Sequence, residues 1–251
     1  MLLYHLLWSA GKLIRPTFRN LTDSFESWAY REGFLRQIHA LEARTFIERH
    51  PGGGAAEAIY RLSEKGRLVA LGGRDPIAQW KRQWDGQWRM VLFDLPEVKA
   101  SGRVKLRRFL RGNGFGYLQN SVWITPDPLN PIMTELSALA GDVESLITLE
   151  ARPALGETDA DIVDGAWDFK KINGLYENCL KVFHQLPNER AQQDGAAEKL
   201  QRWAHLERST WKHAVSADPL LPDELLPAGY IGKKVWNERV NTLAAAHRLI
   251  R

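Results

Sequence analysis

The hydrophobic pattern of this chain is clearest in its middle third. Residues 89–95 are mostly apolar and are followed by Pro96, which predicts a short strand ending there because proline interrupts a sheet. Apolar residues then recur at helical spacing over residues 99–111, ahead of two glycines that favour a helix end. A run rich in aromatic and β-branched residues, 115–125, predicts a second strand.

The same alternation of elements continues beyond this block. Residues 127–140 have a helical pattern, and residues 141–152 are typical of another strand. The resulting order of strand, helix, strand, helix and strand favours a small ferredoxin-like α+β sandwich. We therefore expect a central ferredoxin-like domain over residues 76–152.

The first 75 residues have a different layout. The pattern predicts three helices, listed as residues 1–10, 17–28 and 30–44. Two short strands follow, 46–49 and 58–62, around a glycine-rich bend, and a short helix begins after Ser63. Three helices followed by a two-stranded wing predict an N-terminal winged helix-turn-helix domain over residues 1–75, with residues 30–44 as its recognition helix. The alternative is a small helical cap with no nucleic-acid role.

The last hundred residues predict a mostly helical C-terminal domain, 153–251. Its helices are expected over residues 160–186, 188–215 and 233–251. The proline-rich stretch 218–227 between the last two is expected to wrap the surface. The fold class predicted for the whole chain is therefore α+β.

Composition narrows the classes of protein that fit. Of 251 residues, 44% are hydrophobic and 25% are charged, as in an ordinary globular chain. The single cysteine, Cys179, excludes an internal disulfide and a cysteine-rich zinc site, which suits a cytoplasmic location. No segment has membrane-spanning length, and residues 1–8 are too short for a signal peptide. We expect no membrane, no cofactor and no bound metal.

The positive charge is concentrated at the front of the chain. The formal net charge is +4, and residues 1–80 hold 11 basic against 8 acidic side chains. This excess mildly favours a phosphate-facing surface. Candidates for base contact lie in the expected recognition helix: Arg36, Gln37 and His39. Candidates for phosphate contact are Arg44, Arg49 and Arg61, and ordinary solvated side chains are the alternative for all six.

Four sequence blocks carry a resemblance to a known family. They are Trp84-Asp85-Gly86-Gln87-Trp88, Phe93-Asp94-Leu95-Pro96-Glu97, Gly114-Phe115-Gly116 and Gln119-Asn120-Ser121-Val122-Trp123. In this order and spacing they resemble the central domain of the PaaX family of bacterial transcriptional repressors of phenylacetic acid catabolism. The segment 218–227 resembles the closing part of the same family.

The resemblance implies a function and an assembly. It implies a homodimeric repressor that binds a double-stranded DNA operator, with the central domain similar to a dimeric subunit of the CRISPR spacer-acquisition machinery. This chain departs from the family in its first domain, where Leu35 and Ala40 stand at positions that usually carry arginine. Residues 51–58 contain no lysine or arginine in a wing that is usually basic. An interaction module without specific DNA binding therefore stays open as an alternative.

The resemblance also implies an aromatic acyl-coenzyme A effector, phenylacetyl-coenzyme A in relatives. Aromatic and basic side chains of the C-terminal domain are the effector-binding candidates: Trp167, Tyr176, Trp203, His205, Arg208 and Trp211. An aromatic stripe at helical spacing is also what a plain core contains.

Two further features leave alternatives open. Asp94 matches the catalytic aspartate of the spacer-acquisition nucleases, so a metal-dependent nuclease is the rival function, against a structural role for Asp94 in the turn before Pro96. No second ligand stands at a convincing spacing, and we expect the protein not to be an enzyme. Six basic residues over 99–111 fit either a phosphate-binding track or a solvated helix face, with the solvated face favoured.

Overall fold

The computed structural model describes residues 34–51, 58–94, 100–119, 121–140, 145–154, 156–189 and 195–250. It contains both helices and sheets, which confirms the predicted α+β class. The chain forms two compact units, each discontinuous in sequence. The first comprises residues 1–74, 178–212 and 235–251, and the second comprises residues 75–177 and 213–234.

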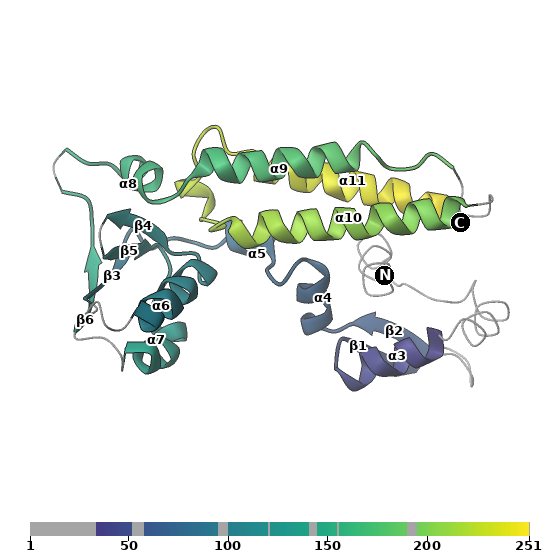
Figure 1. Cartoon of the computed structure of the whole chain (residues 1–251), viewed down its shortest axis with the longest axis horizontal. Helices are drawn as coiled ribbons and strands as arrows, with labels where there is room; N and C mark the ends of the chain where they lie inside the picture. The colour runs from purple at the N-terminus through teal and green to yellow at the C-terminus, as the bar shows by residue number, and fades with distance from the viewer. Residues whose placement is uncertain are drawn as a thin grey trace. The chain divides into compact units, whose positions relative to one another are not determined.

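Figure 1 labels the α-helices and the strands. Together with two short 3-10 helices, η3 and η4, they run in chain order as follows. They are α3 (Phe34–Ala43), β1 (Ile47–Pro51), β2 (Ala58–Leu62), α4 (Glu64–Ala70), α5 (Pro76–Trp80), β3 (Trp88–Asp94), α6 (Ala100–Gly112), β4 (Gly116–Gln119), β5 (Val122–Thr125), η3 (Asn130–Ile132), α7 (Met133–Ala140), β6 (Ser145–Ala151), α8 (Asp159–Ala166), α9 (Phe169–Phe183), α10 (Ala196–Ala217), η4 (Asp223–Leu225) and α11 (Gly232–Ile250).

The first unit contains the helix and the hairpin expected near the N-terminus. Helix α3 falls within the predicted recognition helix, and β1 pairs antiparallel with β2 in a register that sets Ile47 opposite Leu62. The two helices predicted over residues 1–10 and 17–28 lie outside the described residues. The complete winged helix-turn-helix layout therefore stays a prediction.

Helix α4 begins after Ser63, as predicted, and Ser63 is its N-cap. The Ser63 hydroxyl donates to the Thr45 carbonyl oxygen at 2.6 Å and accepts from the Gly66 N–H at 3.0 Å. Behind it, a Cβ placed on Gly66 would lie 1.9 Å from the Phe46 carbonyl oxygen. Only glycine allows this approach, so the start of α4 lies directly on the turn after α3.

Removing the Ser63 hydroxyl should destabilise the first unit. We expect Ser63→Ala to lower the free energy of unfolding by about 1–2 kcal/mol, because it leaves the Gly66 N–H without its cap. Chemical denaturation followed by circular dichroism measures this change. The exposed neighbour Glu64 provides the control, since Glu64→Gln should change stability by less than about 0.5 kcal/mol. An unchanged midpoint for Ser63→Ala would contradict this account of the cap.

The second unit is built on a four-stranded antiparallel sheet. Its strand order is β4-β5-β3-β6, and helix α6 connects β3 to β4 while α7 connects β5 to β6. This β-α-β-β-α-β connectivity is that of a ferredoxin-like unit. Leu106, Leu110 and Leu136 of the two helices are fully buried in one core with strand residues Val91 and Phe93. Helices α6 and α7 therefore cover one face of the sheet.

One predicted strand was wrong. The run 115–125 was expected to form a single strand, but it forms the hairpin β4–β5, in which Gln119 pairs with Val122. The chain reverses direction between these two strands. The aromatic and β-branched residues on both sides of the turn favoured one continuous strand. The strand count rises to four, which completes the sheet.

The first sequence block, residues 84–88, has a structural role. The side chain of Asp85 accepts two bonds from Arg89, which is almost completely buried, and this pairing lowers the pKa of Asp85. The Trp88 ring donates to Asp159 at 2.7 Å and packs 6.0 Å from the Trp167 ring. The block therefore joins the start of β3 to α8, on the sheet face away from α6.

The predicted helix over residues 160–186 is interrupted. Trp167 has an extended backbone (φ −130°, ψ 137°), and the side chain of Asp168 accepts from the Lys171 N–H at 2.8 Å. This cap starts a new helix, so α8 and α9 are separate. Apolar spacing continued through the break, which is why the pattern did not indicate it.

The proline-rich segment is also placed differently from the prediction. It was expected to wrap the surface, but Leu220 and Leu221 are fully buried. The buried Asp218 carboxylate accepts bonds from the hydroxyls of Tyr176, at 2.6 Å, and Tyr230. These bonds hold the segment inside the second unit, and burial raises the pKa of both phenols.

Candidate nucleic-acid interface

The end of α3 and the turn after it present a compact group of cations. Thr45 closes the helix with a positive φ of 58°, and Phe46 donates to the Leu41 carbonyl oxygen at 2.9 Å. This turn places the Arg44 guanidinium 4.7 Å from the centre of the Phe46 ring and the Lys65 ammonium 5.0 Å from it. Both side chains are exposed, so two positive charges share one aromatic platform.

The base-contact candidates lie on α3 itself. The backbones of Arg36 and Gln37 are within this helix, and their side chains lie outside the described part of the structure. His39 is 70% exposed, and its Nδ1 lies 3.8 Å from the Glu42 carboxylate on the next turn. Ile38 is buried, so it lies on the inward side of the helix. His39 therefore lies on the outward side of the helix.

The register of the hairpin separates two phosphate-contact candidates. Arg49 pairs with Tyr60, whereas Arg61 pairs with Glu48. Successive residues of a strand point to opposite faces, so Arg49 and Arg61 lie on opposite faces of the hairpin. Both are exposed, but Arg61 has an acidic neighbour directly across the ladder. A single duplex backbone running along one face meets only one of them.

Four of the six effector candidates lie on α10 in the first unit. The buried Trp203 ring donates to the Val182 carbonyl oxygen at 2.8 Å, and the buried Trp211 ring donates to that of Leu71 at 3.0 Å. Their polar atoms are therefore bonded within the protein. Arg208 and Trp211 line a recess of about 110 Å³ together with Lys212.

The other α10 candidate, His205, is exposed. The 110 Å³ recess is small beside the roughly 300–1,000 Å³ that small-molecule sites occupy.

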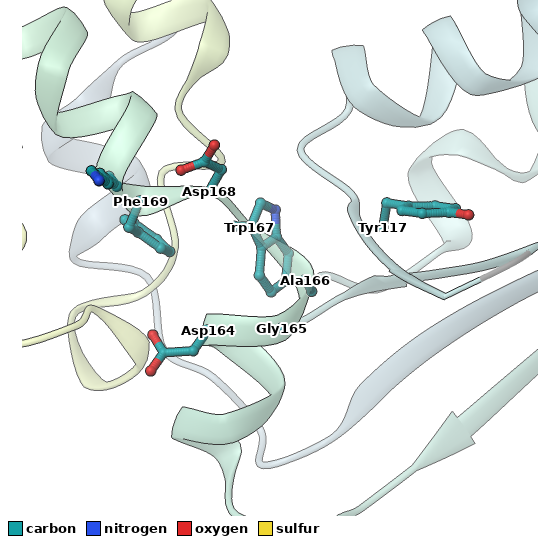
Figure 2. A pocket seen from close by; sticks show the side chains of 8 residues that line it. Tyr117, Asp164, Gly165, Ala166, Trp167, Asp168 and Phe169 are labelled. Atoms are coloured by element: carbon teal, nitrogen blue, oxygen red, sulfur yellow. The ribbon is translucent and has the colours of Figure 1, made fainter.

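The two remaining effector candidates belong to the second unit. Tyr176 is fully buried and bonded to Asp218. Trp167 donates to the Gly114 carbonyl oxygen at 3.2 Å and lines an open recess of about 510 Å³. Figure 2 shows Asp164 and Asp168 on one side of its ring and Tyr117 on the other.

The charges of this recess bear on its ligand. Two carboxylates against one lysine, Lys170, give it a negative balance. That charge disfavours the phosphates of a coenzyme A group.

Cys179 lies on α9 and is fully buried. Burial raises the pKa of its thiol to about 12. Because the thiolate is the reactive form, we expect no labelling by a thiol reagent such as 5,5′-dithiobis(2-nitrobenzoic acid) at neutral pH in the native protein. Full labelling should follow in denaturant. Rapid labelling of the folded chain would contradict the buried position.

The alternative function, a metal-dependent nuclease, needs a set of metal ligands. Asp94 is the last residue of β3, where it pairs with Ser145, but its side chain lies outside the described part of the structure. Within the described ranges, no group of three or more His, Cys, Asp or Glu side chains is placed to hold a metal ion.

Sequence reasoning missed some residues that the structure places at these sites. Lys65 was not a candidate, because only the fold brings it to the Phe46 ring beside Arg44. Tyr117 and Asp164 of the larger recess were also missed, because they come from separate elements that only the folded sheet brings together.

Comparison with known families covers most of the chain. Residues 81–163 match the PaaX protein central Cas2-like domain, and residues 167–247 match the PaaX-like protein C-terminal domain. The chain belongs to the PaaX family. This confirms the resemblance carried by the four central sequence blocks and the closing segment.

Individual relatives agree with this assignment. The transcriptional repressor PaaX of Escherichia coli (strain K12) is 28% identical over 184 residues, which cover 70% of this chain and 57% of that repressor. The chain thus spans a little more than half of that curated relative's length. A similar fold is found in the uncharacterized protein Rv0674 from Mycobacterium tuberculosis, with a TM-score of 0.55, 24% identity and coverage of 99% of this chain and 94% of that one. No helix among the described residues is both long and apolar enough to cross a bilayer.

Proposed function

We propose that this PaaX-family protein is a cytoplasmic transcriptional regulator, a repressor that binds operator DNA. The observation that carries the proposal is the match of two successive PaaX domains in a chain that also aligns with a named transcriptional repressor. The exposed basic side chains around α3 and the β1–β2 hairpin agree with it. In this proposal the first unit is a winged helix-turn-helix.

The proposal assigns the DNA contacts to residues of the first unit. Helix α3 enters the major groove, where Arg36, Gln37 and His39 face base edges. Arg44 and Lys65, on their shared aromatic platform, lie against phosphates at the end of the helix. The hairpin adds Arg49 from one of its faces, since the other face carries Glu48 beside Arg61.

A homodimer is part of the proposal, and the exposed surface of β6 supports it. This edge strand carries Ile147 and Leu149, which are 50% and 48% exposed. Both lie on the sheet face away from α6, beside Leu92 and Met90 of β3. An exposed apolar edge is normally covered. A second copy of this chain is the occupant that would also present two recognition helices to a near-palindromic operator.

The last part of the proposal is an effector. An aromatic acyl-coenzyme A is the expected ligand class. The recess beside Trp167 is the larger one, with a volume of about 510 Å³. The smaller recess beside Trp211 carries positive charge from Arg208 and Lys212. A thermal-shift series with aromatic acyl-coenzyme A compounds tests it. A rise in Tm with the matching thioester, and none with coenzyme A alone, would support it. No shift with any thioester would reject this class.

A gel-shift experiment with hairpin variants tests DNA binding. We expect the full chain to retard a duplex from its own upstream region without metal, and Arg49→Ala to weaken that complex about tenfold through the loss of a phosphate contact. Arg61→Ala should change affinity less than twofold because it lies on the opposite face of the hairpin.

Equal losses for the two hairpin variants would contradict this orientation. Metal-dependent cutting of the duplex would instead support the alternative that the protein is a metal-dependent nuclease. If the chain retards no duplex, the result would support the alternative of an interaction module without specific DNA binding.

A further inference from the structure

Helix α6 of the second unit carries an unusual charge pattern. Residues 98–126 contain six basic side chains and no acidic one, and all six basic residues lie in or next to α6. Among the described helices of eight or more residues, α6 alone contains no Asp or Glu. The absence of interleaved acids sets it apart from an ordinary solvated helix face, which mixes both signs.

The exposed positive charges of α6 lie along one side. Leu106 and Leu110 are fully buried against the sheet, whereas Lys105, Arg108 and Arg111 are exposed. Their three-residue spacing places them on neighbouring turns of the same face, over about 9 Å of helix axis. We call Lys105, Arg108 and Arg111 the α6 stripe.

Among the residues that the structure describes, no acidic side chain is paired with the stripe. None of its three members makes an ion pair within the described ranges, whereas Arg82 and Arg89 of the same unit are both paired with carboxylates. The one specific contact of the stripe is that of the Arg111 guanidinium, which lies 5.5 Å from the centre of the Trp123 ring. Like charges three or four residues apart destabilise a helix, so the stripe carries a cost that a polyanion would relieve.

We infer that the α6 stripe binds the phosphate backbone of duplex DNA. This contact is independent of sequence and is additional to the one proposed for the first unit. The inference rests on the proposed DNA-binding function. A duplex carries one negative charge per roughly 1.7 Å of its axis, so a stripe of this length faces several phosphates. A convex helix face suits a long polyanion better than a small phosphorylated ligand, which binds in a concave site.

An anionic membrane surface is the other broad class of polyanion. Interfacial helices need a large exposed apolar face beside their charges. On the exposed side of α6, Val104 is the only large hydrophobic residue within the described part of the helix. The stripe is therefore a surface for electrostatic contact with nucleic acid.

The test compares two triple variants of the full chain in fluorescence anisotropy titrations with a labelled upstream duplex at several salt concentrations. The first is Lys105→Gln, Arg108→Gln, Arg111→Gln. The matched control is Lys171→Gln, Lys181→Gln, Lys234→Gln, which removes three positive charges from exposed positions of α9 and α11. A double variant, Lys105→Gln with Arg108→Gln, retains the Arg111 contact with Trp123 in case its loss affects folding.

We expect the α6 triple variant to bind at least tenfold more weakly at low salt. Its slope of log K against log salt should fall by about 2–3, since each released phosphate contact contributes about 0.9. The double variant should lower the slope by about two thirds as much as the triple variant, because it removes two of the three contacts. The matched control should bind within twofold of the wild type.

Several outcomes would overturn the inference. If the α6 variants keep wild-type affinity and slope while wild-type protein binds DNA, the stripe has no such role and the proposed function stands. Equal losses of affinity in the matched control would show an effect of net charge only. Binding by the stripe to anionic vesicles or RNA in preference to duplex DNA would also overturn it. Failure of the wild type to bind any duplex would reject the proposed function together with the inference.

Discussion

Replacing Glu207 with alanine is expected to lower the free energy of unfolding by about 3–5 kcal/mol. Glu207 is fully buried on α10, and its carboxylate accepts from Arg239 Nε of α11 at 2.7 Å. The Arg239 guanidinium also lies 4.5 Å from the centre of the Trp211 ring. Removal of Glu207 leaves this guanidinium charged, buried and without its carboxylate partner. Denaturant unfolding at neutral pH measures the loss.

Further variants separate the contribution of the ion pair to stability from the contribution of side-chain packing. Arg239→Met alone should also be strongly destabilising, since it leaves the buried carboxylate without this partner. The double variant Glu207→Leu with Arg239→Met should recover much of the loss, because apolar residues of similar volume replace buried pairs well. Arg202→Ala, at an exposed position of the same helix, is the control and should change stability by less than about 0.5 kcal/mol. A loss below about 1 kcal/mol for Glu207→Ala would contradict the role of the pair.

The second large effect is expected at β6. Replacing both Ile147 and Leu149 with aspartate should convert the proposed homodimer into a monomer and weaken operator binding by about a hundredfold or more. In a two-fold interface each substitution counts twice, so four carboxylates would be desolvated against apolar surface. A monomer also loses the gain from binding two half-sites together. Sedimentation velocity reports the mass, and anisotropy reports the affinity.

The control for this experiment is Val240→Asp, which places the same charge at an exposed apolar position of α11 that is 37% accessible. It should leave the mass and the affinity unchanged. A double β6 variant that stays dimeric would show that the dimer uses another surface. A wild-type monomer that binds the operator tightly would remove the dimer from the proposal.

Local signals in the sequence predicted the elements that have clear ends. Pro96 and Gly112 delimited β3 and α6, and Ser63 marked the start of α4. The break at Trp167 was missed because the apolar pattern continued through it. The β4–β5 hairpin was missed although residues 119–121 are all polar, because the aromatic and β-branched residues on both sides favoured one continuous strand. Long-range pairing is a different matter: Glu207 and Arg239 are 32 residues apart, and nothing in either segment indicates that they meet.

For the candidate sites, the sequence indicated which residue types to consider but not how the fold places their side chains. Aromatic residues at helical spacing look the same whether they line a ligand site or a core, and the structure places Trp203 and Trp211 in the core with their ring N–H groups bonded to carbonyl oxygens. For the hairpin, the sequence indicated Arg49 and Arg61 as exposed cations. Only the register placed them on opposite faces.

The central claim is that this PaaX-family chain recognises a particular DNA sequence. The most direct measurement is the ratio of its affinities for an upstream duplex and for a scrambled duplex of the same composition, at about 150 mM salt without divalent metal. The account predicts a ratio of about 10³ or more, as specific regulators reach. A ratio near one would contradict it, because phosphate contacts alone do not distinguish the two duplexes.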